Sequence, residues 1–129
     1  MTVILDSSAW IEMFSNDRNA TAFMQVVSES ETILVPSVVI YEVYRYALRL
    51  FGAEKAQELW GTMTQQTVVD LDANLAAAAA EIAHTLKLAM ADAIILATAR
   101  HYAADLWTQD ADLKGLDGVR YVEKKSSPA

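Results

Sequence analysis

The 129-residue sequence predicts one α/β domain with a parallel β-sheet, and three observations support this. Short apolar runs rich in β-branched residues alternate with segments of helical hydrophobic spacing. The Asn-Gly dipeptide, a strong signal for a tight turn between antiparallel strands, does not occur. The hydrophobic share of 53% and the charged share of 21% are those of an ordinary globular protein. Strands separated by helices in such a chain indicate parallel pairing.

The expected strands are short runs that end in an acid, a proline or a polar turn. Four of them are well marked, and a fifth run could add a strand at the end of the chain. The sheet is therefore mainly parallel with four to five strands, from residues 2–5, 32–35, 67–71, 105–108 and 119–122.

Helices are expected between these strands, and several begin after a residue suited to capping. Asp6, Ser7 or Ser8 can cap the first helix, Asn16 or Asp17 the second, and Ser37 the third. The spacing predicts helices over residues 7–14, from about 17 to the high twenties, 37–50, 53–65, 72–86 and 89–102.

The chain shows no repeat, low-complexity block or linker, so residues 1–122 are expected to form one domain, followed by a polar tail over 123–129 that frays. The absence of cysteine excludes disulfides and thiolate chemistry and suits a cytoplasmic protein. The Ala-rich stretch 73–99 is interrupted by Glu81, His84, Lys87 and Asp92, so no membrane association is expected. The net charge of −7 argues against a basic nucleic-acid coat.

Four acidic residues are expected at the carboxyl edge of the sheet, where ligands of parallel α/β sheets bind. Asp6 follows the first strand and Asp110 follows the fourth. Glu42 lies early in the helix that begins at this edge, and Asp92 lies at the start of the helix that leads back into the fourth strand. The orientation of the helix over 72–86 is left open by the sequence.

Four carboxylates in one pocket would raise one another's pKa unless a cation balances them. Ligands that are all oxygen select Mg²⁺ or Mn²⁺ over zinc. Such an ion lowers the pKa of a bound water and neutralises charge on a phosphate, which is the chemistry of phosphodiester hydrolysis.

Each acid also has a structural explanation when taken alone. Asp6 is equally explained as a helix cap, Glu42 as a solvated helix residue, and Asp110 and Asp112 as turn residues. Asp92 differs because it stands in an apolar run, where an unpaired carboxylate is costly, although the helix dipole favours an acid in the first turn. The set of four carries the inference.

The segments that hold these acids resemble the PIN-domain ribonucleases, and in particular the VapC-type toxins of toxin–antitoxin pairs. The resemblance covers essentially the whole chain and rests on LDSSAWIE, VPSVVIYEVYR, MADAIILATAR and LWTQDADL. It implies a three-layer α/β/α fold, endoribonuclease activity dependent on Mg²⁺ or Mn²⁺, and an antitoxin protein that blocks the site.

The family's acidic residues correspond to Asp6, Glu42, Asp92 and Asp110 of this chain. We expect Asp6 and Asp92 to be the principal metal ligands, Asp110 to complete the metal site, and Glu42 to orient the attacking water or hold a second ion. The resemblance also implies supporting roles for Ser7, Thr108 and Asp112. Hydrolysis by water would leave a 5′-phosphate and a 3′-hydroxyl.

Two arginines one helical turn apart, Arg45 and Arg49, are expected to meet RNA phosphates beside Glu42 or to pair with acids. The helix pair over 37–65 carries more apolar surface than the sheet needs, which predicts a contact with an antitoxin helix or a homodimer. Seven aromatic residues could stack on RNA bases, but most of them are expected to be buried in the core: Trp10, Phe14, Phe23, Tyr41, Tyr44, Trp60 and Trp107.

Two other functions fit parts of the pattern. A metal-dependent phosphatase of the haloacid-dehalogenase type also has Asp after its first strand, but it needs a second acid where Ser8 stands. A degenerate PIN domain could act as an RNA- or protein-binding module without catalysis. The presence of all four acids argues against this second alternative.

Overall fold

The computed structural model describes residues 1–125, so residues 126–129 of the polar tail expected over 123–129 lie outside the described part. Within residues 1–125, five strands form one sheet in the order β3-β2-β1-β4-β5, and every neighbouring pair is parallel. The strands are β1 (Thr2–Leu5), β2 (Thr32–Pro36), β3 (Thr67–Val69), β4 (Asp105–Thr108) and β5 (Val119–Tyr121). The prediction of an α/β fold with a parallel sheet is confirmed, and the last run does form a fifth strand.

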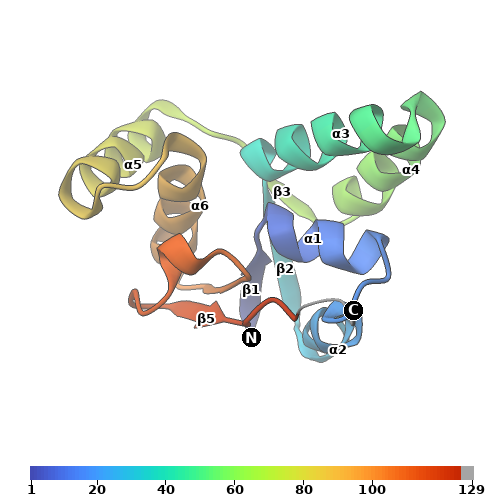
Figure 1. Ribbon diagram of the computed structural model, residues 1–129. Helices are drawn as coiled ribbons and strands as arrows, with labels where there is room; N and C mark the ends of the chain where they lie inside the picture. The colour runs from blue at the N-terminus through green and yellow to red at the C-terminus, as the bar shows by residue number, and fades with distance from the viewer. Residues whose placement is uncertain (126–129) are drawn as a thin grey trace.

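Helices cover both faces of this sheet and complete a three-layer α/β/α arrangement. In Figure 1, α5 and α6 lie on one side of the strands, and α1, α3 and α4 lie on the other. The described residues form six α-helices: α1 (Ser7–Phe14), α2 (Ala20–Glu29), α3 (Ser37–Phe51), α4 (Ala53–Thr64), α5 (Ala73–Leu86) and α6 (Met90–His101), with a short 3₁₀ helix η1 (Ala111–Leu113).

The order in which the chain adds strands to the sheet changes direction between β1 and β4. From β1 the chain moves outward to β2 and β3, whereas from β4 it moves to β5 on the other side. In sheets of this kind the carboxyl ends of the strands at the reversal point leave a crevice for ligands. The residues that follow β1 and β4 are therefore the ones placed for chemistry.

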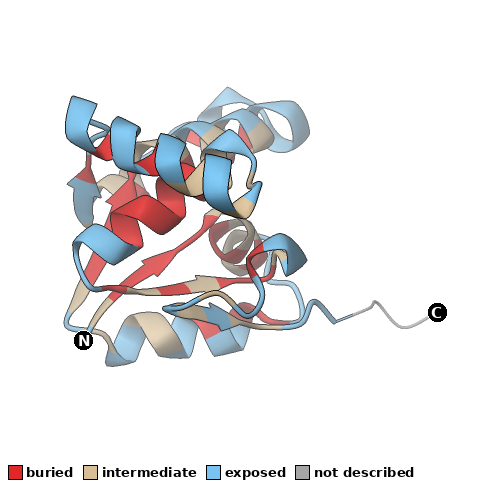
Figure 2. Cartoon of the chain, turned by 90° about the vertical axis from the view of Figure 1, so that its left-hand side faces the viewer, coloured by how far each residue is buried: buried red, intermediate tan, exposed pale blue. Residues whose placement is uncertain are grey.

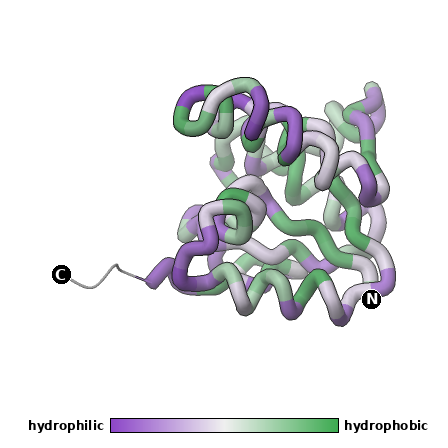
Figure 3. The backbone as a smooth tube through the Cα atoms, turned by 90° about the vertical axis from the view of Figure 1, so that its right-hand side faces the viewer, coloured by the Kyte–Doolittle hydropathy of each residue, from purple (hydrophilic) through white to green (hydrophobic). Residues whose placement is uncertain are grey.

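Helix α6 is buried on nearly all sides, as is typical of a helix held between a sheet and another helix. Seven consecutive residues from Ala93 to Ala99 are buried, and α5 packs against the helix from outside. Figures 2 and 3 show that the central strands are both buried and hydrophobic. Along the outer helices, buried and exposed residues alternate. Asp92, in the first turn of α6, is thus an acid directly before the buried part of a helix that packs in the core.

Two of the predicted helix caps are wrong. Pro36, and not Ser37, is the residue before α3, and Ser37 is its first helical residue. The second helix begins later than predicted, after Asn19, and the Asp17 carboxylate accepts a hydrogen bond from the backbone N–H of its neighbour Arg18. Asp6 and Asp72 do cap α1 and α5 with their side chains.

Among residues 1–125, no helix by itself has the length and apolar character to span a membrane. Helices α5 and α6 meet those criteria only as a pair, and the chain bends by 115° between them.

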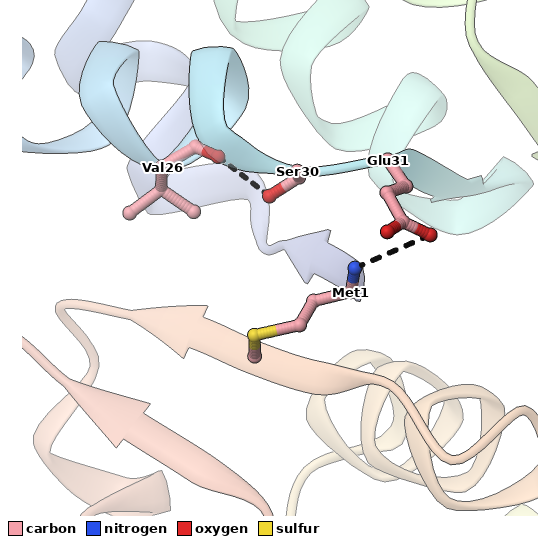
Figure 4. Close-up of polar contacts among 4 residues, drawn as sticks. All are labelled: Met1, Val26, Ser30 and Glu31. Carbon is pink, nitrogen blue, oxygen red and sulfur yellow. Dashed lines mark hydrogen bonds and ion pairs between the residues drawn. The ribbon is translucent and has the colours of Figure 1, made fainter.

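At the sheet edge opposite the crevice, one ion pair and one hydrogen bond lie near the start of β1 and the end of α2 (Figure 4). The Met1 amino group lies 3.6 Å from a carboxylate oxygen of Glu31, and the Ser30 hydroxyl donates to the Val26 carbonyl at 2.5 Å. Both members of the ion pair are exposed, so it adds little stability.

Candidate active site

The first acid of the site, Asp6, is held rigidly at the end of β1. Its Oδ1 accepts hydrogen bonds from the Ser8 hydroxyl at 2.6 Å and the Ala9 backbone N–H at 3.1 Å, and its Oδ2 accepts one from the Thr108 hydroxyl. The side chain is buried, and burial raises its pKa, an effect that these hydrogen bonds oppose and the charge of Asp110 reinforces. Asp6 therefore both caps α1 and faces the other acids.

Asp92 carries the clearest sign of converging charge. Its pKa is raised to about 7, first by burial, then by the charge and hydrogen bonding of Asp110, and further by the charges of Asp6 and Glu42. The other three predicted acids thus all lie close enough to act on Asp92. The expectation that α6 begins at the carboxyl edge agrees with this position.

Asp110 lies beyond the end of β4, in reach of two other carboxylates. Carboxylate oxygens of Asp92, Asp110 and Asp112 all lie within 4.8 Å of one another. Asp110 also accepts the Asp112 backbone N–H at 2.9 Å, which caps η1 and fixes both residues relative to each other. Asp112, expected in a supporting role, therefore lies as close to this cluster as a ligand would.

Glu42 is positioned from the second turn of α3. Its carboxylate accepts the Ser7 hydroxyl at 2.5 Å, so the first helix of the chain orients the acid that the third helix supplies. Ser7 and Thr108 thus each bond to one of the four acids, Ser7 to Glu42 and Thr108 to Asp6.

The donor set fits a hard divalent cation. Its oxygen ligands come from carboxylates alone, and the charges of Asp110, Asp6 and Glu42 add to burial in raising the pKa of Asp92. Mg²⁺ and Mn²⁺ prefer such ligands and would relieve the repulsion.

Two exposed arginines border the acids. Tyr41, Glu42, Arg45, Tyr46 and Arg49 line one small surface pocket. Among residues 1–125 neither arginine lies within ion-pair distance of an acid, and the Arg49 guanidinium instead lies 5.6 Å from the centre of the Tyr46 ring. Both cations therefore remain available to a ligand beside Glu42.

A buried polar cluster behind the acids was not predicted from the sequence. Ser8 is expected there only as a cap, and Glu12, Asn19 and Gln109 are not singled out, yet each of these three is less than 10% exposed. The spacing holds one clue, because Glu12 lies three residues after the buried Ala9 and hence on the same face of α1.

The sequence matches the family model described as PIN domain over residues 3–119. The chain belongs to the PIN-domain family. A search of curated proteins found no match.

Solved structures of several relatives share this fold. One is a chain of a toxin–antitoxin complex from Klebsiella pneumoniae, at 22% identity and a TM-score of 0.80, covering 95% of this chain and 99% of the other. A sarcin–ricin-loop-cleaving VapC toxin from Mycobacterium tuberculosis has 17% identity and a TM-score of 0.77 over 96% and 99% of the two chains. A chain of a VapBC complex from Rickettsia felis, bound to a DNA fragment from its promoter, has 15% identity and a TM-score of 0.74 over 97% and 100%.

Proposed function

We propose that this PIN domain is a metal-dependent endoribonuclease and the toxin of a toxin–antitoxin pair, acting in the cytoplasm where its RNA substrate lies. The observation that carries the proposal is the convergence of Asp6, Glu42 and Asp110 on the partly buried Asp92, whose pKa is raised to about 7 by burial and by these neighbouring charges. Structural relatives support the substrate class, since one of them is described as a toxin that cleaves the sarcin–ricin loop.

Asp6, Asp92 and Asp110 would hold the ion, with Asp112 beside them. A bound Mg²⁺ or Mn²⁺ would supply a water of lowered pKa and neutralise charge on the phosphate. Asp6 keeps its position because both its oxygens already accept hydrogen bonds from the protein. Glu42, fixed by Ser7, orients the attacking water, which displaces the 3′-oxygen in line and leaves a 5′-phosphate.

The direct test is incubation of purified protein with total RNA in Mn²⁺ or Mg²⁺, with and without a chelator. Discrete fragments that require the metal are expected, and Glu42→Gln should reduce their rate of formation. A folded protein that binds Mn²⁺ but cleaves no RNA would favour the binding-module alternative. The phosphatase alternative has less support, because the residue two positions after Asp6 is a serine whose hydroxyl donates to Asp6.

Replacing both Arg45 and Arg49 by Gln should weaken RNA binding mainly at low salt. Removing one phosphate-binding cation from a complex with single-stranded nucleic acid lowers the slope of log K against log salt by about 0.7. We expect the slope to fall by roughly 1.4 if each arginine binds one phosphate, measured by fluorescence anisotropy with a catalytically inactive protein. An unchanged slope would mean that the two arginines do not bind phosphates.

The groove between α3 and α4 is proposed as the antitoxin site. The expectation that the aromatic residues lie in the core is correct for Trp10 and Phe23 but wrong for Tyr41 and Trp60, which are 63% and 51% exposed. These two residues and the exposed Leu48 account for the surplus apolar surface expected on this helix pair. The groove is lined by Ser37, Ile40, Tyr41, Tyr44, Arg45, Leu48, Gln57, Trp60 and Gly61.

An amphipathic antitoxin helix would fill such a groove, and structures of relatives are described as toxin–antitoxin complexes. It would reach Arg45 at the border of the acids and so obstruct RNA. A homodimer is proposed in addition, and light scattering of the isolated chain tests it, since a monomeric mass would exclude it.

Trp60→Ala should weaken binding of the product of the neighbouring gene by about 30-fold, because central aromatic residues contribute about 2 kcal/mol or more to such interfaces. RNA cleavage should stay unchanged, since Trp60 does not line the pocket beside Glu42. Met24→Ala, at an exposed apolar residue of α2, is the control. Equal affinities for all three proteins would exclude the groove as the antitoxin site.

A further inference from the structure

Three buried polar side chains outside the acidic cluster bind one another across three elements of the fold. Glu12 of α1 accepts the Asn19 backbone N–H at 2.9 Å and the Gln109 side-chain amide at 3.3 Å. The Asn19 side-chain amide donates to the Gln109 side-chain oxygen at 2.7 Å and to the Glu123 carbonyl at 3.0 Å. Their exposed fractions are 4%, 1% and 8%, so water contributes little to satisfying them.

This trio meets the active site through the backbone after β4. The Gln109 backbone N–H donates to the Ser8 hydroxyl at 3.1 Å, and that hydroxyl donates to Asp6 at 2.6 Å. The Asp110 backbone N–H donates to the Thr108 hydroxyl at 2.9 Å, and that hydroxyl donates to the other oxygen of Asp6. Two hydroxyl groups therefore connect the Asp6 carboxylate to two successive backbone amides.

The Gln109 backbone is fixed by the hydrogen bond of its own N–H to Ser8 and by that of the next N–H to Thr108. The Gln109 side chain is held by Glu12 and Asn19. Among residues 1–125 the ion pairs lie elsewhere, so Glu12 is a buried carboxyl group whose partners are amides. Apolar side chains of the same volume would avoid the cost of desolvating these polar groups. What the polar trio adds over an apolar filling is a fixed geometry.

We infer that Gln109 is a positioning residue: held by Glu12 and Asn19, it fixes the backbone of residues 108–110 against α1 and so sets the separation of the Asp6 and Asp110 carboxylates. This inference rests on the proposed function only in assigning those two acids to a metal ion. Groups that orient metal ligands change metal affinity or activity by roughly 10- to 100-fold when they are removed.

The test is Gln109→Met, which keeps the side-chain length and removes its three side-chain hydrogen bonds, two of them within the trio and one to the Ser8 carbonyl. We expect Mn²⁺ to bind about 10-fold more weakly by calorimetry, with a lower kcat and little change in KM. Two controls lie at the opposite sheet edge: Ile33→Val lowers stability, and Ser30→Ala removes one hydroxyl hydrogen bond (Figure 4). Both should bind Mn²⁺ like the wild type.

A reversed pair provides the rescue experiment. Gln109→Glu alone places two buried carboxyl groups side by side and should weaken Mn²⁺ binding. In the double variant Glu12→Gln, Gln109→Glu, the amide and carboxylate exchange places, and the Asn19 donors keep acceptors on both partners. Only the 3.4 Å hydrogen bond from the Gln109 side chain to the Ser8 carbonyl is removed, so the double variant should recover most of the Mn²⁺ affinity.

A readout without metal separates this inference from the proposed function. Hydrogen exchange at the Gln109 and Asp110 backbone amides should quicken in Gln109→Met and stay unchanged in a stability-matched Ile33→Val. Wild-type protein that binds no Mn²⁺ would refute the proposed function while the exchange rates still decide the role of Gln109. If Gln109→Met binds Mn²⁺ as tightly as the wild type and its backbone amides exchange at the same rates, the three side chains only pack the core, and the inference is overturned.

Discussion

Replacing Asp92 by Asn is expected to abolish metal-dependent RNA cleavage while making the metal-free protein more stable at neutral pH. The amide keeps the shape of the carboxyl group but removes a charge that Asp110, Asp6 and Glu42 all repel. It also removes an anionic ligand from the cluster, so activity should fall at least about 100-fold. Loss of activity and gain of stability in one variant is the mark of a site built for a cation.

Both effects can be measured on one preparation. A stability gain of about 1 kcal/mol would raise the melting temperature by roughly 4 °C in a domain of this size. Asp105→Asn is the matched control, because Asp105 begins β4 at the other sheet edge and is partly buried beside Arg120 at 3.9 Å. That control should retain cleavage. An Asp92→Asn protein that still cleaves RNA would remove Asp92 from the metal site.

The second large effect is a dependence of stability on pH that reverses when metal is added. The pKa of Asp92 is about 7 in the folded protein, against an ordinary value of 3.8. Between these two pH values the folded state therefore keeps a proton on Asp92 that the unfolded state has released. In chelator, the free energy of unfolding should therefore decrease as pH rises from about 4 to 7. The raised pKa of Asp6 acts in the same direction.

Mn²⁺ binds the deprotonated carboxylates, so its affinity should increase over the same pH range and its binding should release protons below pH 7. Urea unfolding at pH 5, 6, 7 and 8, with chelator and with Mn²⁺, measures both trends. In Asp92→Asn the decrease in chelator should be much smaller. Wild-type stability in chelator that rises steadily from pH 5 to 8 would contradict the assigned charge repulsion.

The position of the four acids could be predicted from the sequence because it depends on few features of the fold. A parallel strand followed directly by an acid puts that acid at the carboxyl edge, as for Asp6. A lone acid in the apolar run that becomes α6 needed a partner or a metal, and Asp92 indeed lies against Asp110. Such inferences need only the direction of each strand and helix.

Contacts that depend on side-chain direction could not be predicted in the same way. Glu12 and Gln109 are 97 residues apart, and no local pattern marks their pairing. Tyr41 and Trp60 have the composition of core residues, but α3 and α4 bury Val39, Val43, Ala56 and Leu59 and turn these two rings outward. The exact residue at which a helix begins was also missed twice: Ser37 lies inside α3 after the extended Pro36, and the Asp17 carboxylate accepts the N–H of its neighbour Arg18 and does not cap α2.

The most direct measurement on the central claim is the chemistry of the ends that cleavage leaves on RNA. Fragments made by the purified protein in Mn²⁺ should carry a 5′-phosphate and a 3′-hydroxyl, and a chelator should prevent their formation. Such ends mean that water attacked the phosphorus, as the mechanism proposed for Asp6, Glu42, Asp92 and Asp110 requires. Fragments ending in a 2′,3′-cyclic phosphate would show that the RNA's own 2′-hydroxyl attacked, and fragments formed equally well in chelator would show that cleavage needs no metal. Either result would contradict this mechanism.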